Sequence, residues 1–273
     1  MDQWDDPEVV AAWRRWRARF AEQTRVLTEV LLEAAGVWPG MHVLDLASGA
    51  GEPALALAKD VGPRGYVTAT DVSDGMLAII ADAARAEGLA NIGCRRADAA
   101  ALTFPDESFD LVTCRLGIMH IPDAEEALRE ARRVLKPGAR AAFLVWGGSP
   151  DESGAFLHSR IIAKYIGVPP PPANAPSALR FASPGSLPAA LREAGFRQVE
   201  EMTHRCVMAC PGTPTQVWRS IREMAGPLRQ LLARAPAETL ERIHEEVETA
   251  FQAFRKGEYV QLPATVHVAT GLR

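Results

Sequence analysis

Short apolar segments alternate with helical segments through the first 150 residues, and this alternation restricts the fold more than any other feature. Five runs have strand length: 41–47, 65–70, 92–97, 109–114 and 141–146. Segments of helical period, such as 73–87 and 124–135, separate them. Strands that alternate with helices imply crossover connections and a parallel sheet. With two later strands at 196–208 and 264–270, we expect a doubly wound α/β fold with a seven-stranded, mostly parallel sheet.

Helical patterns surround this alternation. Asp6 and Pro7 read as an N-cap and a first-turn proline before a helix over 8–35, which we expect to stop at Gly36. Residues 148–182 hold a short helical stretch and the stiff run Pro169–Pro172, which indicates a loop or cover segment. A helix is predicted over 183–195, and 214–255 is mostly helical.

The overall balance of charge excludes some classes of partner. The chain has 273 residues and a net charge of −4, so it offers no general attraction for a phosphate backbone. One cluster departs from this balance, because arginines at 14, 15, 17 and 19 are interleaved with Trp13, Trp16 and Phe20. Such a helix either lies on a membrane surface or nucleic acid, or packs its aromatic side chains inward. We expect inward packing, which every globular domain needs of its helices.

Cysteine usage and the chain start give a location. The four cysteines lack the spacing of a metal site, so we expect no bound metal. The acidic start Met1–Asp6 does not resemble a secretion signal, and no apolar run approaches the roughly 20 residues of a membrane span. We therefore expect a cytoplasmic protein with no integral membrane span and no nucleic-acid partner.

A glycine-containing turn follows the first predicted strand, in Val43-Leu44-Asp45-Leu46-Ala47-Ser48-Gly49-Ala50-Gly51. Small residues there let a ligand approach the backbone at the start of a helix. The turn is compatible with a dinucleotide site, since Ala54 supplies the third small position of that fingerprint. Asp71, which ends the second strand, suits the ribose of either kind of nucleotide. Glu52 favours a ligand without phosphate at this helix start.

The chain resembles the class I S-adenosylmethionine-dependent methyltransferases, in their ubiquinone/menaquinone C-methyltransferase-like branch. The resemblance covers 40–146 closely. Besides the glycine turn, the segments that carry it are Thr70-Asp71-Val72-Ser73 with Met76-Leu77, Ala97-Asp98-Ala99, Phe104-Pro105-Asp106-Glu107-Ser108-Phe109-Asp110 and Arg133-Val134-Leu135-Lys136-Pro137-Gly138. Each segment is a weak signal alone, but their order and spacing together are specific. One departure is Ala47, where the family usually has glycine.

The resemblance implies a role for each matching position, with S-adenosylmethionine as cofactor and S-adenosylhomocysteine as product. The turn residues Ala47, Ser48, Gly49 and Gly51 would hold the methionine part, with Asp45 beneath it near the amino group. Asp71 would bind the ribose hydroxyls, and Val72, the next residue, would belong to the same cofactor site. Met76 would pack against adenine. Asp98 would accept from the adenine amino group, with the Ala99 amide at the ring edge. The backbone around Arg115 would close the carboxylate side.

The methyl acceptor is less legible, because methyl transfer from a sulfonium needs little beyond alignment and exclusion of water. His120, in the loop after the fourth strand, is the candidate catalytic residue; it either contacts the acceptor or its proton, or orients the loop, for example through Asp123. The cover segments favour a small, partly apolar acceptor, methylated on carbon, nitrogen or oxygen. We expect a monomer or homodimer.

The whole chain is expected to be one methyltransferase domain. It divides into an N-terminal helical cap (1–36), a cofactor-binding core (40–147), an insertion (148–182) and a C-terminal part (183–273) with a helical insertion at 214–255. Three other functions stay open. They are a nicotinamide-dependent oxidoreductase, a non-catalytic S-adenosylmethionine-binding module and an arsenic methyltransferase; the last needs several thiolates, and only Cys114 lies near the expected site.

Overall fold

The computed structural model describes residues 3–149, 153–167, 172 and 175–273. The chain forms two compact units. The sheet unit comprises 27–147, 173–204 and 266–273, and the helical unit comprises 1–26, 148–172 and 205–265. The expected single methyltransferase domain stays a prediction.

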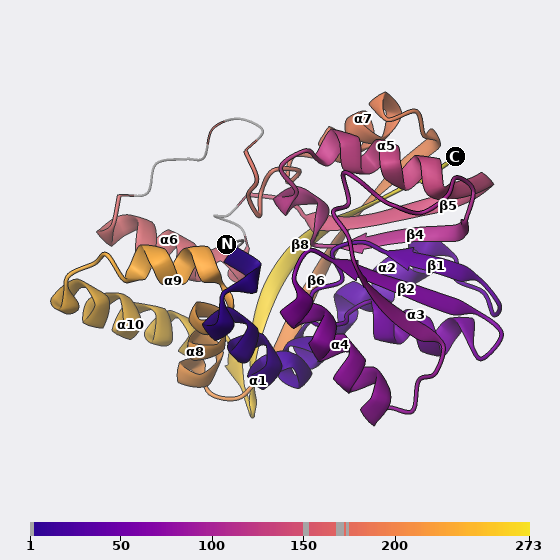
Figure 1. Cartoon of the computed structure of the whole chain (residues 1–273). Helices are drawn as coiled ribbons and strands as arrows, with labels where there is room; N and C mark the ends of the chain where they lie inside the picture. The colour runs from indigo at the N-terminus through magenta and orange to yellow at the C-terminus, as the bar shows by residue number, and fades with distance from the viewer. Residues whose placement is uncertain (1–2, 150–152, 168–171, 173–174) are drawn as a thin grey trace. The chain divides into compact units, whose positions relative to one another are not determined.

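The sheet confirms the doubly wound fold (Figure 1). Its strands are β1 (His42–Asp45), β2 (Tyr66–Asp71), β3 (Ile92–Arg96), β4 (Phe109–Arg115), β5 (Leu135–Trp146), β6 (Arg197–Pro211) and β8 (Tyr259–Leu272), in the order β3-β2-β1-β4-β5-β8-β6. Strands β1 to β5 are parallel, and β8 pairs antiparallel with β5. The strand order reverses between β1 and β4, where ligands of such sheets bind.

Helices fill the crossovers of the sheet unit. They are α2 (Arg25–Ala35), α3 (Ala54–Val61), α4 (Asp74–Ala86), α5 (Ala124–Val134) and α7 (Ser186–Glu193), with a short 3₁₀ helix η2 (Ile118–His120). Helix α4 is capped at both ends, since the Ser73 hydroxyl accepts from the Met76 amide at 3.3 Å and Gly88 follows the helix with φ +69°. Val43 and Leu44, on opposite faces of β1, are both fully buried, as in a sheet covered on two sides.

Two predicted elements differ from those observed. The single helix over 8–35 is broken at Thr24, whose hydroxyl donates to the Phe20 carbonyl at 2.8 Å and which leaves helical geometry at φ −103°, ψ 11°. Strand β5 begins six residues before the predicted 141, at Leu135. The segment Lys136-Pro137-Gly138, whose proline and glycine favour a turn, lies inside β5 as an irregularity, where the register with β4 shifts.

The helical unit contains α1 (Pro7–Gln23), α6 (Leu157–Tyr165), α8 (Pro214–Met224), α9 (Gly226–Leu232) and α10 (Ala237–Gln252). It also contains the 3₁₀ helices η1 (Gln3–Asp5) and η3 (Gly154–Phe156) and the two-residue strand β7 (Arg255–Lys256). Trp218 of α8 is 1% exposed and is the largest of the fully buried side chains. The predicted proline run lies outside the described residues except for Pro172.

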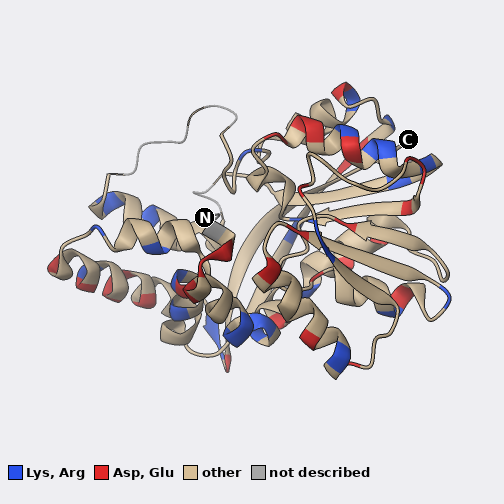
Figure 2. Ribbon diagram, viewed as in Figure 1, with Lys and Arg blue, Asp and Glu red and all other residues tan. Residues whose placement is uncertain are grey.

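Helix α1 packs its aromatic side chains inward, as expected. Trp16 is 8% exposed, and its indole nitrogen donates to Glu223 of α8 at 2.7 Å. Arg15 also pairs with Glu223, at 2.9 Å, and Figure 2 shows the basic residues of this helix. None of the helices that the structure describes is long and apolar enough to cross a membrane.

Candidate functional site

A tight turn leaves the end of β1 and leads into α3. Ala47 and Gly49 have left-handed backbone conformations, with φ of +50° and +52°, and Gly51 has φ +115°. The Ser48 amide donates to the Thr70 carbonyl of β2 at 2.9 Å, and the Ser48 hydroxyl donates to the Asp45 carbonyl at 3.0 Å. The turn is thereby attached to both β1 and β2. A side chain at Gly51 would clash with Leu55, since its Cβ would lie 2.7 Å from Leu55 Cδ1.

Asp71 links this turn to the end of β2. Its Oδ2 accepts from the Gly49 amide at 2.9 Å, and its Oδ1 accepts from the Ser73 amide at 3.0 Å. The residue is 8% exposed, so its carboxylate is largely shielded from solvent beside the turn. Each oxygen keeps further lone pairs for a ligand hydroxyl.

Asp45 lies at the base of the same turn and is fully buried. Its Oδ1 accepts from the Thr113 hydroxyl of β4 at 2.6 Å, while its Oδ2 is buried and has no hydrogen-bond partner among the described residues. Burial raises the pKa of this carboxyl to about 7, and the Thr113 hydroxyl and the nearby Arg115 oppose the rise. Asp45 is therefore poised to lose its proton when a cation comes near.

Arg115 ends β4 and is 7% exposed. Its Nε donates to the Glu52 carbonyl at 3.2 Å, and its Nη1 donates to the Thr28 hydroxyl of α2 at 3.3 Å. Burial lowers the pKa of the guanidinium, and the charges of Glu52 and Asp45 counter this shift. Asp45, Asp71 and Arg115 thus lie at the ends of β1, β2 and β4, and Glu52 lies in the turn that leads into α3.

The remaining predicted cofactor residues lie next to Asp71. The Ala97 amide donates to the Asp71 carbonyl at 3.0 Å, and this places the segment 97–99 beside the end of β2. Asp98 is exposed, and its Oδ1 accepts from the Ala100 amide at 2.9 Å, whereas Ala99 is buried. Val72 is half-buried directly after β2, and Met76, in the first turn of α4, is 2% exposed.

His120 lies in η2, in the loop that follows β4. Its side chain is half-buried, and burial lowers the pKa of the imidazole, which is therefore neutral near pH 7. The loop closely approaches the turn 47–51, since a Cβ added at Gly117 would lie 2.7 Å from the Ala47 methyl group. Asp123 caps α5 by accepting from the Glu126 amide at 2.9 Å.

Several residues of this site were missed by sequence reasoning. Thr28, Thr113 and the Glu52 carbonyl hold Arg115 and Asp45 in place, yet no local motif marks them. The apolar run 109–114 indicates only that Thr113 belongs to a buried strand. Its pairing with Asp45 is a consequence of the parallel register of β1 and β4.

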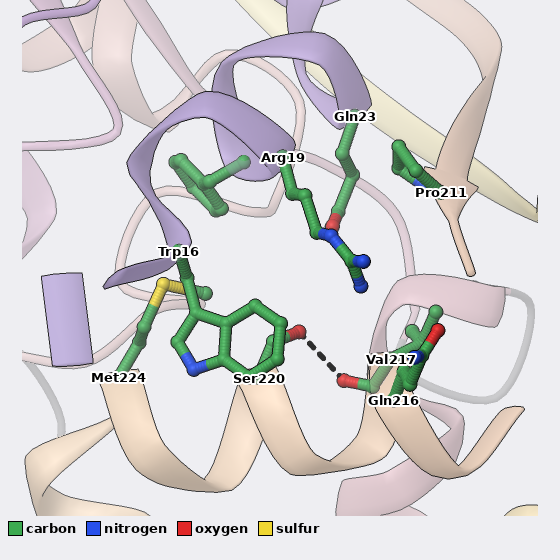
Figure 3. A pocket seen from close by; sticks show the side chains of 9 residues that line it. Trp16, Arg19, Gln23, Pro211, Gln216, Val217, Ser220 and Met224 are labelled. Atoms are coloured by element: carbon green, nitrogen blue, oxygen red, sulfur yellow. Dashed lines mark hydrogen bonds between the residues drawn. The ribbon is translucent and has the colours of Figure 1, made fainter. Parts of the chain in front are cut away.

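The helical unit has a pocket of its own between α1 and α8 (Figure 3). Arg19 and Gln23 of α1 extend into it, Arg19 over the ring of Trp16, and Gln216 lines its α8 side. Its empty space is about 240 Å³ even with open solvent included. That is less than the roughly 300 Å³ at the lower end of small-molecule sites, so we do not place an acceptor there.

The same unit buries a cluster of aromatic and imidazole rings. Trp218 lies between His158 and His244, at ring-centroid distances of 5.9 and 5.8 Å, and its indole nitrogen donates to His244 Nδ1 at 2.9 Å. Burial lowers the pKa of His158 to about 4. His244 contacts Trp218, and its Nε2 lies 3.0 Å from Arg222 Nη1.

Much of the sheet unit is similar in sequence to known methyltransferases. Residues 20–148 match the model of the ubiE/COQ5 methyltransferase family. The ubiquinone/menaquinone biosynthesis C-methyltransferase UbiE of Shewanella sediminis is 39% identical over 121 residues, which are 44% of this chain and 48% of that protein. The 2-phytyl-1,4-naphtoquinone methyltransferase of Synechococcus elongatus is 47% identical over 108 residues, 39% of this chain and 46% of that protein.

The chain thus spans about half the length of the curated relatives it matches. Among solved structures, a SAM-dependent methyltransferase from Aquifex aeolicus is similar with a TM-score of 0.50 and 26% identity. That match covers 63% of this chain and 80% of the other. The matched core has the class I methyltransferase fold.

Proposed function

From residue 20 to residue 148 the chain belongs to the ubiE/COQ5 methyltransferase family, and we propose that it transfers the methyl group of S-adenosylmethionine to a ring carbon of a small quinol. One observation carries the proposal: the turn 47–51, at the point where the strand order reverses, is bonded through Gly49 to the carboxylate of Asp71. The names of the two relatives above suggest the quinol class of acceptor.

The residues at the strand ends fit this cofactor. Nothing lies within 4 Å of a Cβ placed at Gly49, so the turn has open space where the methionine part would lie. The Asp45 Oδ2 is buried without a partner among the described residues, and the cofactor's ammonium group would supply a positive charge near it. Asp71 would accept from the ribose hydroxyls, with Val72, Met76, Asp98 and Ala99 around the adenine.

A nicotinamide dinucleotide fits less well. A pyrophosphate needs free amides at a helix start, but the residue before α3 is Pro53, which has no N–H to donate. Glu52 adds a negative charge at the same place. A sulfonium cofactor, which carries no phosphate, avoids both problems.

Thiolate chemistry, as an arsenic methyltransferase requires, also lacks support. Cys114, the cysteine nearest the site, is fully buried, and burial raises the pKa of its thiol to about 12. A thiol with this pKa stays protonated at neutral pH and is a poor ligand and nucleophile.

The proposed reaction is an in-line displacement on carbon. When bound, S-adenosylmethionine supplies an electrophilic methyl group on a sulfonium. Neutral His120 removes the hydroxyl proton of the quinol, and the charge that develops makes the adjacent ring carbon nucleophilic. A C–C bond forms as the methyl–sulfur bond breaks, loss of the ring proton restores the aromatic ring, and the protonated His120 returns its proton to the quinol oxygen. The products are methylquinol, S-adenosylhomocysteine and one proton.

The test combines binding with turnover. We expect wild-type protein to bind S-adenosylmethionine by calorimetry and to methylate 2-prenyl-1,4-naphthohydroquinone under reducing conditions. Asp71→Ala should weaken cofactor binding at least ~10-fold, about the loss of one charge-assisted contact. Asp71→Asn keeps one accepting oxygen for the turn, so its affinity for S-adenosylmethionine should lie between those of the wild type and Asp71→Ala.

Other results would decide against parts of the proposal. Unchanged cofactor affinity in Asp71→Ala would remove the role of that carboxylate, and full turnover in His120→Ala would remove the role of the imidazole. Tight cofactor binding without turnover on any quinol would favour the non-catalytic binding module. The absence of metal, the cytoplasmic location and the monomeric or homodimeric state stay predictions from the sequence.

A further inference from the structure

A segment distant in sequence holds the backbone on both sides of His120. We call residues 175–182 the strap. The Ser177 amide donates to the Met119 carbonyl at 3.1 Å. The Arg180 Nη1 donates to the Ile121 carbonyl at 2.7 Å and to the Pro122 carbonyl at 3.2 Å. The carbonyl groups of the two residues that flank His120, Met119 and Ile121, are therefore both bonded to the strap.

The strap is itself ordered by local contacts. The Arg180 amide donates to the Ser177 carbonyl at 3.1 Å, and the Ala182 amide donates to the Leu179 carbonyl at 3.0 Å. Phe181 is 8% exposed and belongs to the same apolar core as Ile118 and Met119 of the loop. The strap and the loop thus share a core as well as hydrogen bonds.

A buried histidine ties the end of the strap to the sheet. His267 of β8 is 1% exposed, and its Nε2 lies 3.0 Å from the Ala182 carbonyl. A carbonyl only accepts, so Nε2 carries the proton, and Nδ1 accepts from the Thr203 hydroxyl of β6 at 2.8 Å. A side chain at Gly147 would displace this ring, because its Cβ would lie 2.5 Å from Nε2.

From this geometry we propose that Arg180 is a positioning residue, which fixes the loop 118–122 so that His120 faces the acceptor. The inference rests on the proposed methyl transfer and adds a residue that no motif marks. A guanidinium suits this place, since one planar, permanently charged group serves two neighbouring carbonyls at once. Lysine would offer a single ammonium point charge and hold the loop less firmly.

The test compares Arg180→Ala and Arg180→Lys with a matched control, Arg132→Ala. Arg132 also donates to a backbone carbonyl in the sheet unit, that of Gly195 at 2.9 Å. In Arg180→Ala we expect amide hydrogen exchange at His120 and Ile121 to become at least ~10-fold faster, about the loss of one charge-assisted hydrogen bond. Arg180→Lys should show a smaller increase, and the control should show none.

Two readouts separate positioning from general loss of structure. Nuclear magnetic resonance should show the pKa of His120 moving up toward its ordinary value in Arg180→Ala, because the imidazole becomes less buried. With 2-prenyl-1,4-naphthohydroquinone, kcat should fall at least ~10-fold, while the dissociation constant for S-adenosylmethionine stays unchanged. The exchange and titration experiments need neither cofactor nor acceptor.

The proposal is overturned if exchange at His120 and Ile121, and the His120 titration, match those of the control. If Arg180→Ala does not fold, Arg180→Lys carries the test, and wild-type exchange in that variant overturns the proposal. Failure of the proposed function looks different, because the wild-type protein would then fail to methylate the quinol, with or without cofactor binding, while the exchange and titration experiments still report on Arg180.

Discussion

Asp45 is a carboxyl group that the folded chain buries before any ligand binds. Its pKa is raised from 3.8 to about 7, so the folded state holds this proton more tightly than the unfolded state does. The contribution of Asp45 to the free energy of unfolding is therefore fully present below about pH 4 and is lost as the pH rises toward 7. The site therefore costs the ligand-free protein stability at neutral pH, as functional sites often do.

The variant Asp45→Asn tests this cost. Asparagine keeps an oxygen for the Thr113 hydroxyl but carries no charge. Between pH 5 and pH 7 we expect the free energy of unfolding of the variant to gain about 2 kcal/mol relative to wild type, from about 1.4 kcal/mol per pKa unit. Urea unfolding at both pH values measures the gain. The same difference between variant and wild type at both pH values would show that Asp45 titrates normally.

Ala47 and Gly117 form a second coupled pair at the residue scale. Ala47 has a left-handed conformation that costs an alanine about 1 kcal/mol, and its methyl group leaves no room for a side chain at Gly117. We expect Gly117→Ala to destabilise the fold by about 2 kcal/mol, because it overpacks the loop against Ala47 and Cys114. Ala47→Gly should stabilise the wild type by about 1 kcal/mol by relieving the left-handed backbone, and it should stabilise Gly117→Ala by more than this, because it also removes the methyl group that the new side chain meets. Strictly additive effects in denaturant unfolding would contradict the coupling.

At the scale of elements, helices α6, α8 and α10 share the cluster of His158, Trp218 and His244. The pKa of His158 is lowered from 6.5 to about 4, so the unfolded chain binds this proton more readily than the folded chain. The contribution of neutral His158 to the free energy of unfolding is therefore present above about pH 6.5 and is lost as the pH falls toward 4. Burial also lowers the pKa of His244, in the same direction.

We expect the helical unit to lose stability on acidification, by up to about 3 kcal/mol from His158 alone. Replacement of His158 by Phe, which keeps a ring against Trp218, should remove much of this dependence. Thermal unfolding followed by circular dichroism at pH 7.5 and pH 4.5 provides the measurement. His42→Gln, at an exposed position, serves as the control. An equal loss in all three proteins would assign the acid sensitivity to other groups.

For the whole molecule, the features that could be predicted from the sequence are those that local patterns specify. The strand and helix sequence followed from periodicity and caps, and the turn at 47–51 and Asp71 followed from a motif whose residues lie within 25 positions of one another. The contacts of Thr113 with Asp45, and of Arg180 and His267 with the strap, join segments about 60 to 85 residues apart. Such pairings depend on strand order and register, which periodicity does not specify.

The helix break at Thr24 could not be predicted from periodicity either, although it depends on a short-range contact. The apolar period continues through residues 8–35, and it predicts one helix because it reports only which face is buried. The hydroxyl of Thr24 ends α1 by bonding to Phe20, a competition that a hydrophobic pattern does not register.

Methyl transfer by this chain requires that the sheet unit bind a sulfonium nucleoside at the turn 47–51. The most direct test is thermal unfolding of the wild-type protein with S-adenosylmethionine, S-adenosylhomocysteine or NAD, each at saturating concentration. A ligand at 100 times its dissociation constant adds about 2.7 kcal/mol to the stability of a native state that alone binds it. We predict a clear rise in Tm with the two sulfur nucleosides and none with NAD. A rise with NAD alone, or no rise with any of the three, would contradict the claim.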